Sequence, residues 1–182
     1  VIGSVTIDNS GFLRIRKLVL AYRNYLKEKG LLIEKQVRYS SFKLNGDSII
    51  YENVTSERII FSEGRFISEN PFFSWLPYNL TKGQMLTVKV NTPLGPSKIY
   101  NQQFLFFPTE EKDIFRLGAT YSWNETDEEP TKEATQELLD KVKKALDIEL
   151  EVLVAQAAIR PTVADRRPTI GVHPQRKKCI PV

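Results

Sequence analysis

Apolar residues that recur at intervals of three and four positions predict two amphipathic helices. The first covers about residues 15–29 and is followed by Gly30, which suits the left-handed residue that ends many helices. The second covers residues 131–146 and begins with Thr131, a good N-cap residue. The apolar faces consist of Ile15, Leu18, Val19, Tyr22 and Leu26 in the first helix, and of Ala134, Leu138, Val142, Ala145 and Leu146 in the second.

Alternating apolar and polar residues, separated by turn residues, predict strands in most of the remaining chain. The predicted strands are residues 1–8, several short segments of 31–64, and residues 82–90, 102–108, 113–123 and 148–159. Residues 31–64 should form an antiparallel meander with a hairpin turn at Asn45-Gly46, and residues 148–159 are apolar enough for a central strand. These elements predict an α+β fold with a mixed, largely antiparallel sheet and two main helices, in one domain over residues 1–182.

Composition places the chain among ordinary globular proteins. Hydrophobic residues make up 41% and charged residues 26% of the sequence, and no apolar run is long enough to cross a membrane. The first residues lack the basic and apolar regions of a signal peptide, so no membrane partner is expected. Cys179 is the single cysteine, which excludes an internal disulfide and fits a reducing compartment, and we therefore expect a cytoplasmic protein.

The residues argue against several kinds of chemistry. His173 is the only histidine and Cys179 the only cysteine, which gives little support to a metal site or to a serine or cysteine triad. A metal site made of carboxylates alone stays open, although no spacing favours it. No glycine-rich phosphate loop is present. The charge is unevenly distributed: residues 125–129 are acidic and residues 160–178 are strongly basic. The net charge of +4 therefore comes mostly from the C-terminal stretch. A nucleic-acid-binding surface would combine basic residues with exposed aromatic residues, but most aromatic residues here lie in apolar segments. Nucleic acid is therefore not the expected partner.

The stretch AAIRPTVADRRPTIG, residues 157–171, resembles the segment G-x-R-P-x-x-x-D-x-x-P-x-I-G of the FAD-dependent oxidoreductases of the D-amino-acid oxidase and glycine oxidase superfamily. Other pieces resemble the same family in the same order, and together they cover essentially the whole chain. They are GFLRIRKLVLAYRNYLKEKG, RIIFSEG, LTKGQMLTVKV, QQFLFFPTEEKDIFRLGATYSW and TKEATQELLDKVKKAL. The family's N-terminal dinucleotide-binding half and its C-terminal FAD segment have no counterpart here, so the resemblance covers the substrate domain with adjoining elements.

This resemblance implies the substrate-binding portion of an oxidoreductase that oxidises an amine or amino acid by hydride transfer from a C–N bond to FAD. The partners would be that small molecule and the missing FAD-binding half. FAD would belong to the complete protein, because its glycine-rich site is missing from residues 1–182. The isolated fragment should therefore be inactive.

The resemblance also implies roles for five residues. Arg160, held extended by Pro161, would bind the substrate carboxylate through two parallel hydrogen bonds. The alternative for Arg160 is an ion pair with an acid such as Asp165. The remaining residues are Phe106 and Tyr100 in the substrate pocket, with core packing as their alternative, and Lys82 and Gly171 near the cofactor, with an exposed lysine as the alternative for Lys82.

Two readings from other classes stay open. The first is a non-enzymatic α+β binding module whose basic C-terminal tail contacts an acidic partner or nucleic acid. The second is a structural or truncated product whose last residues, KKCIPV, are not natural. In all three readings, residues 165–167 are expected to form a turn with local ion pairs.

Overall fold

A computed structural model describes residues 5–45, 48–91, 94, 98–123, 125–163, 165 and 167–181. By its internal contacts the chain divides into two compact units, Val1–Phe42 and Lys43–Val182. The expectation of one domain over residues 1–182 stays a prediction. In the described part of the chain, no helix combines the length and the apolar character needed to cross a membrane.

The first unit contains the predicted N-terminal helix. Helix α1 spans Ile15–Glu28, and a 3-10 turn, η1, spans Tyr39–Ser41. Gly30 has φ +66°, and the amides of Gly30 and Leu31 donate to the carbonyls of Lys27 and Leu26, which is the hydrogen-bond pattern of a Schellman motif. The glycine therefore ends α1 as predicted.

Two strand predictions in this unit are wrong. The prediction of a strand at residues 1–8 fails for Val5–Ile7, and residues 31–38 also form no strand; residues 1–4 lie outside the described residues. Neither segment has a ladder partner among the described residues, and alternation alone cannot supply one.

The second unit carries the strands and the second helix. Its elements are β1 (Phe42–Asn45), β2 (Ser48–Tyr51), β3 (Val54–Ser56), β4 (Ile59–Phe61), η2 (Gly64–Glu69), β5 (Tyr78–Val90), β6 (Tyr100–Asn101), β7 (Leu105–Pro108), β8 (Ile114–Gly118), β9 (Ser122–Trp123), α2 (Lys132–Ala145), β10 (Leu150–Val163) and β11 (Cys179–Pro181). The predicted α+β class with largely antiparallel strands is confirmed.

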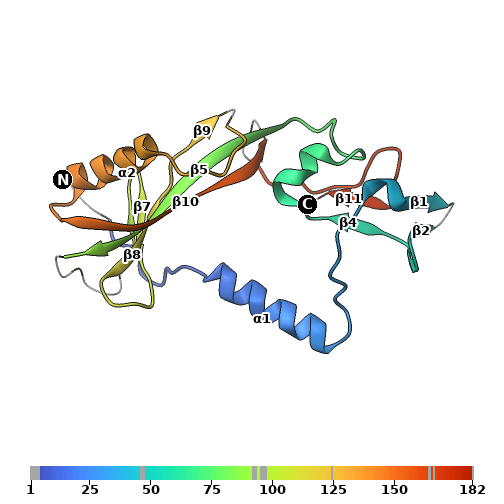
Figure 1. Ribbon diagram of the computed structural model, residues 1–182, viewed down its shortest axis with the longest axis horizontal. Helices are drawn as coiled ribbons and strands as arrows, with labels where there is room; N and C mark the ends of the chain where they lie inside the picture. The colour runs from blue at the N-terminus through green and yellow to red at the C-terminus, as the bar shows by residue number, and fades with distance from the viewer. Residues whose placement is uncertain are drawn as a thin grey trace. The chain divides into compact units, whose positions relative to one another are not determined.

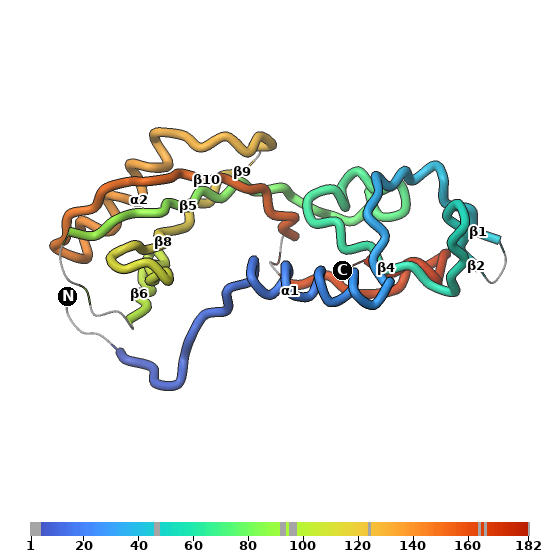
Figure 2. The backbone as a smooth tube through the Cα atoms, turned by 60° about the horizontal axis from the view of Figure 1, so that its bottom comes forward, coloured from blue at the N-terminus to red at the C-terminus, as the bar shows by residue number. Residues whose placement is uncertain are grey.

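The largest sheet has the strand order β10-β5-β8-β7-β6, and β9 pairs with β5 beyond the end of β8. Strands β5 and β10 pair antiparallel from Tyr78 to Val90 and lie side by side over this length (Figure 2). The prediction that residues 148–159 form a central strand is wrong, because β10 lies at the edge of the sheet. Strand β10 is apolar because some of its residues face α2 and because others, such as Leu153 and Val154, are apolar although they are exposed.

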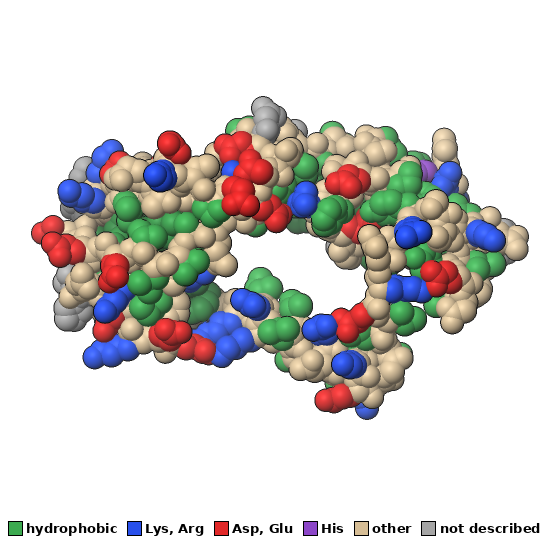
Figure 3. Space-filling model, viewed as in Figure 1, with side chains coloured by type: hydrophobic (Ala, Val, Ile, Leu, Met, Phe, Trp, Pro, Cys, Tyr) green, Lys and Arg blue, Asp and Glu red, His purple; other side chains and the backbone are tan. Residues whose placement is uncertain are grey.

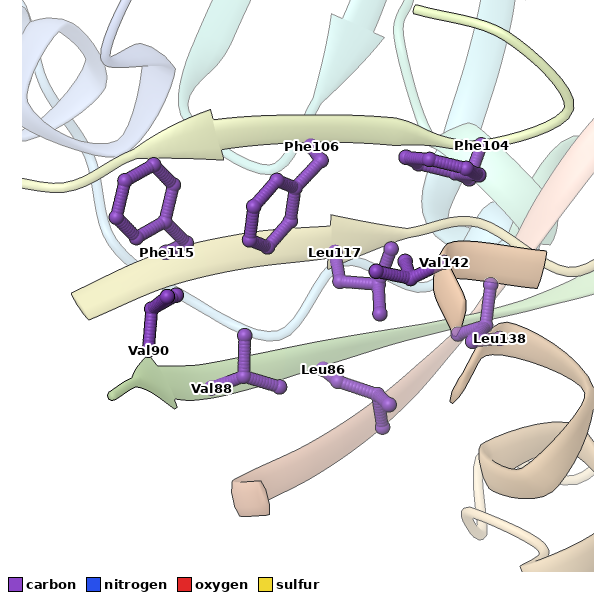
Figure 4. Packing of buried hydrophobic residues seen from close by; sticks show 9 residues of the cluster. All are labelled: Leu86, Val88, Val90, Phe104, Phe106, Phe115, Leu117, Leu138 and Val142. Carbon is purple, nitrogen blue, oxygen red and sulfur yellow. The ribbon is translucent and has the colours of Figure 1, made fainter. Parts of the chain in front are cut away.

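Helix α2 covers one face of this sheet (Figure 1). Thr131 caps it as predicted, since its Oγ1 accepts a hydrogen bond from the amide of Ala134 at 3.1 Å. Apolar side chains of β5, β7 and β8 meet those of α2 in a single cluster (Figure 4). The cluster consists of Leu86, Val88, Val90, Phe104, Phe106, Phe115, Leu117, Leu138 and Val142.

A β-bulge decides which residues of β10 face this core. Val152 lies opposite Val88, but Val154 lies opposite Thr87, so Leu153 is an extra residue on β10. Because side chains alternate along a strand, the extra residue exchanges the two faces. Before the bulge the even-numbered residues face α2, and after it Ala155, Ala157 and Ile159 do, which places Arg160 on the opposite face.

Two smaller sheets complete the unit. Strands β1, β2 and β3 follow one another in a three-stranded sheet within the predicted meander. Strand β3 lies in the segment ENVTSE, residues 52–57, where the sequence pattern indicates a break between strands, and Gly46 of the predicted hairpin turn lies outside the described residues. Strand β4, in contrast, pairs in parallel with β11 at the C-terminal end. The prediction that β4 belongs to the meander is therefore wrong, and the residues after Arg167 fold back onto this part of the chain.

Candidate functional site

Arg160 lies on the face of the large sheet that α2 does not cover, and its guanidinium rests on Gly83 of β5. A Cβ atom at Gly83 would lie only 2.2–2.4 Å from Nη2, Nη1 and Cζ of Arg160. The guanidinium also lies 5.8 Å from the ring centre of Tyr121, and Nη1 donates to the carbonyl of Thr120 at 3.5 Å. Glycine is therefore required at position 83 for this position of the arginine.

The charge of Arg160 is not neutralised by an acid in the described residues. The expected alternative partner, Asp165, binds Arg167 instead: its carboxylate accepts from the Arg167 amide at 3.1 Å and lies 4.0 Å from Nε of the same residue. This is the predicted local turn, although Arg166 lies outside the described residues. Arg160 is exposed, and the described neighbours of its guanidinium, namely Gly83, the Thr120 carbonyl and the Tyr121 ring, are all neutral, so an anion can approach it.

Arg116 of β8 lies on the same face, opposite Thr87 of β5. Its Nη1 donates to Thr87 Oγ1 at 2.8 Å and to Gln156 Oε1 at 3.0 Å, and its Nε and Nη2 point at the sulfur of Met85 at 3.3 and 3.2 Å. Burial lowers the pKa of this guanidinium below its ordinary value. Arg116 was not predicted as a site residue. The available signal was the position of this arginine between the apolar residues Phe115 and Leu117 of a predicted strand.

Phe106 and Tyr100 lie on the face that α2 covers, so the structure does not bring them together with Arg160. Phe106 is 0% exposed and stacks on Phe115 with ring centres 4.7 Å apart, and Tyr100 lies opposite Phe106 in the ladder. Core packing, the alternative for both residues, describes their contacts. Their role in substrate binding stays a prediction without support from these contacts.

The neighbour of Phe106 on the uncovered face is Leu105. Leu105 lies opposite Gly118 and is 39% exposed, and Phe107 lies opposite Arg116. Phe107 is therefore a register neighbour of Arg116, Leu105 lies two residues before Phe107 on the same face, and Tyr121 lies beside Arg160. Sequence reasoning named the residue one position away, and one position along a strand changes the face of the sheet.

Lys82 lies on the covered face and is only 4% exposed. Its Nζ donates to Asp127 Oδ1 at 2.6 Å and to Glu125 Oε2 at 2.9 Å, and these hydrogen bonds raise its pKa while lowering that of Asp127. The face in Figure 3 shows several acidic side chains gathered in one region. Lys82 thus binds the acidic segment that precedes α2. The role of Lys82 near the cofactor stays a prediction.

The segment with Gly171 borders a small cavity. Gly171 is exposed, and a Cβ atom there would have no neighbour within 4 Å. It lines a cavity of about 210 Å³ together with Trp75 and His173, whereas a second cavity, of about 310 Å³, is lined by Tyr78, Pro161 and the segment 167–170 among others. The cofactor role of Gly171 also stays a prediction, because no contact supports it.

The basic C-terminal stretch is partly folded into the protein. His173 is buried, and its Nδ1 accepts from the amides of Gln175 and Arg176 at 3.1 and 3.0 Å. The guanidinium of Arg176 lies 4.9 Å from the ring centre of Phe72. Among the described residues, no group of three or more potential metal ligands is found. His173 therefore has a structural role in these contacts.

The fold agrees with solved structures of two glycine oxidases and an iminodiacetate oxidase. Glycine oxidase from Geobacillus kaustophilus has a TM-score of 0.63 with 19% identity, over 78% of this chain and 40% of that one. Glycine oxidase from Bacillus cereus gives 0.59 and 17%, over 78% and 41% of the two chains. Iminodiacetate oxidase from Chelativorans sp. gives 0.61 and 15%, over 78% and 42%.

These likenesses concern the fold, and the chain spans about two fifths of the length of the solved structures it matches. The match to a protein family is more extensive: the model of the DAO family, described as FAD dependent oxidoreductase, matches residues 1–180. Residues 157–171, with Arg160 and Pro161, lie within this match. The chain belongs to the DAO family of FAD-dependent oxidoreductases.

Proposed function

We propose that this chain supplies the substrate-binding face of an oxidoreductase that oxidises an amine or amino acid, and that Arg160 binds the substrate's carboxylate. The observation that carries the proposal is the position of the Arg160 guanidinium on Gly83, exposed and without an acidic partner in the described ranges. The names glycine oxidase and iminodiacetate oxidase of the structural neighbours support a small carboxylate-bearing substrate.

A guanidinium suits this task because it is planar and permanently charged. It donates two parallel hydrogen bonds to a carboxylate, which fixes the orientation as well as the position of the ligand. Gly83 lets the guanidinium lie flat against the strand, and the ring of Tyr121 limits its movement on one side. A substrate held in one orientation reacts faster because less entropy is lost in reaching the transition state.

FAD belongs to the family's chemistry, but none of the described residues shows a fit to it. Lys82 is engaged by two carboxylates, and nothing packs against Gly171 closely enough to require a glycine. The proposal therefore rests on the substrate-binding residues alone. We also propose that residues 1–182 on their own neither bind FAD tightly nor oxidise a substrate. Stoichiometric FAD binding by the purified 182-residue chain would contradict this second statement.

The carboxylate role is tested with amino acids and amines that differ only in the carboxylate, such as glycine with methylamine and sarcosine with dimethylamine. Flavin reduction is followed under anaerobic conditions in the full-length, FAD-loaded protein. Arg160→Gln should raise the half-saturating concentration of the amino acids about 10- to 100-fold, since charge-assisted hydrogen bonds contribute ~1.5–3 kcal/mol. The amines should be affected much less.

Arg167→Gln is the matched control, because Arg167 is exposed, lies in the same segment and pairs with Asp165. It should leave the preference for amino acids over amines unchanged. Equal effects of Arg160→Gln on amines and amino acids, or no effect on either, would contradict the proposed role of Arg160.

A further inference from the structure

The guanidinium of Arg116 is positively charged, but the side chains that it contacts are neutral. In the part of the chain that the structure describes, no carboxylate forms an ion pair with it; its oxygen partners are Thr87 Oγ1 and Gln156 Oε1. A guanidinium that loses water without gaining an anion is destabilised. Burial lowers its pKa, which is the expected sign of this uncompensated desolvation.

The N–H groups of Arg116 face strong acceptors on one side of the guanidinium and a weak acceptor on the other. Nη1 uses its two N–H groups on the two side-chain oxygens, which fixes the orientation of the guanidinium plane. The other edge, Nε–H and Nη2–H, faces only the sulfur of Met85, at 3.3 and 3.2 Å. This edge is the one that matches a carboxylate bidentately, and a thioether is a weak acceptor on a flexible side chain. A carboxylate can therefore displace the sulfur with a gain in hydrogen bonding.

Arg116 and Arg160 reach toward neighbouring positions of one strand face. The Arg160 guanidinium lies on Gly83, and that of Arg116 lies against Met85, two residues further along β5. Positions i and i+2 of a strand are roughly 7 Å apart and point to the same side. The carboxyl carbons of an extended five-carbon dicarboxylate are about 5 Å apart, from four C–C bonds, so such a ligand can span the two groups.

We propose that Arg116 is a second anion-binding residue, and that the substrate class is an amino acid or amine with two carboxylates, one bound by Arg160 and the other by Arg116. This inference rests on the proposed function, because it assigns the first carboxylate to Arg160. Leu105 and Phe107, on the same face, would then contact the carbon chain between or beside the two charges.

The experiment compares the binding of glutarate with that of butyrate by calorimetry, using the full-length, FAD-loaded protein. The two probes differ in the second carboxylate. Wild type should bind glutarate about 10- to 100-fold more tightly than butyrate, and Arg116→Gln should remove most of that ratio. Lys89→Gln is the control for general electrostatics, since Lys89 is an exposed cation on the same face of β5, and it should leave the ratio within about 3-fold of wild type.

Arg116→Lys covers the case in which Arg116→Gln does not fold, because it retains the charge but cannot donate two parallel hydrogen bonds. It should lower the ratio several-fold. A wild-type ratio near one, or a ratio that neither Arg116 variant changes, would overturn the inference. Arg160→Gln distinguishes failure of this inference from failure of the proposed function. If Arg160→Gln lowers the affinity for butyrate while the Arg116 variants leave the affinity ratio unchanged, only the second site fails. If Arg160→Gln leaves both ligands unaffected, the proposed function itself fails.

Discussion

The cations on the two faces of the large sheet differ in whether they are paired with an acid. On the face covered by α2, the Lys82 ammonium is buried and donates to the carboxylates of Asp127 and Glu125. Gln84, two residues along on the same face, is satisfied as well: its side chain bonds to Thr135 Oγ1 and to both backbone groups of Thr131. Every polar group of this face named here has a partner of matching chemistry.

On the uncovered face, Arg160 and Arg116 have only neutral neighbours in the described residues. Both faces belong to the same strands, so this difference in pairing is a difference between the two sides of one sheet. A buried cation that is paired with an acid is already neutralised, whereas a cation that lacks an acid is available to an external anion. The contrast supports the proposal that the uncovered face, and not the covered one, binds the substrate.

The largest expected effect comes from Phe106→Ala on the covered face. Phe106 is fully buried and stacks on Phe115, so its truncation should lower the free energy of unfolding by about 3–5 kcal/mol. Leu105→Ala is the matched variant on the other face of the same strand and should cost no more than ~1 kcal/mol, because Leu105 is exposed. Urea denaturation measures both. A larger cost for Leu105→Ala would reverse the assignment of the two faces.

The next effect concerns the register of β10 after the bulge, which sets the face of Arg160. Insertion of an alanine after Val154 should shift the following residues by one position and turn Ile159 away from the core and Arg160 toward it. Losing the burial of Ile159 alone should cost about 1.5–3 kcal/mol of unfolding free energy. Deletion of Leu153 is the control, because it removes the bulge but leaves Val154 opposite Thr87. The deletion should leave butyrate binding intact, whereas the insertion should abolish it in calorimetry. Unchanged butyrate binding after the insertion would show that this register does not control Arg160.

The helices and most strands could be predicted because their signals are local. Gly30 ends α1 and Thr131 begins α2 through hydrogen bonds within a few residues, and the alternation of Met85 and Thr87 with Leu86 and Val88 appears in the sequence itself. The face that each strand turns toward the core is not local. For β7 it depends on the register with β8, which is why Phe106 was named in place of Leu105. For β10 it also depends on the bulge at Leu153.

Partners that are distant in the sequence were also beyond prediction. Lys82 binds Asp127, 45 residues away, and no pattern around Lys82 shows that acid as its partner. Strand β4 pairs with β11, near the C-terminal end, and the local sequence of β4 fits a meander equally well. Arg160 could be named without knowledge of its contacts, because the R-P pair and the family resemblance both point to it. Its role as the carboxylate ligand stays a proposal.

Gly83→Ala should separate ligand binding from stability. A methyl group at this position would overlap the Arg160 guanidinium, which can move aside because it is the end of a flexible side chain. The free energy of unfolding should therefore change by less than ~1 kcal/mol, while butyrate affinity falls about 10-fold through the displaced arginine. Gly11→Ala is the control, since its Cβ would meet no atom within 4 Å. Equal butyrate affinity in both variants would show that Arg160 does not need its place on Gly83.

The smallest effect is the pH dependence of the covered face. The hydrogen bond from Lys82, followed by that from the Glu129 amide, lowers the pKa of Asp127 in the folded state, so this carboxylate stabilises the fold above its unfolded pKa of about 4. That contribution is lost as the pH falls through the lower, folded pKa. The hydrogen bonds to Asp127 and Glu125 raise the pKa of Lys82, so its contribution is present below about pH 10.4 and is lost as the pH rises through the higher, folded pKa. Asp127→Asn should therefore flatten the decline in unfolding free energy below pH 4, measured by urea titrations at several pH values. An unchanged slope would show that the Lys82–Asp127 pair, unlike the core beside it, adds nothing to the stability of this face.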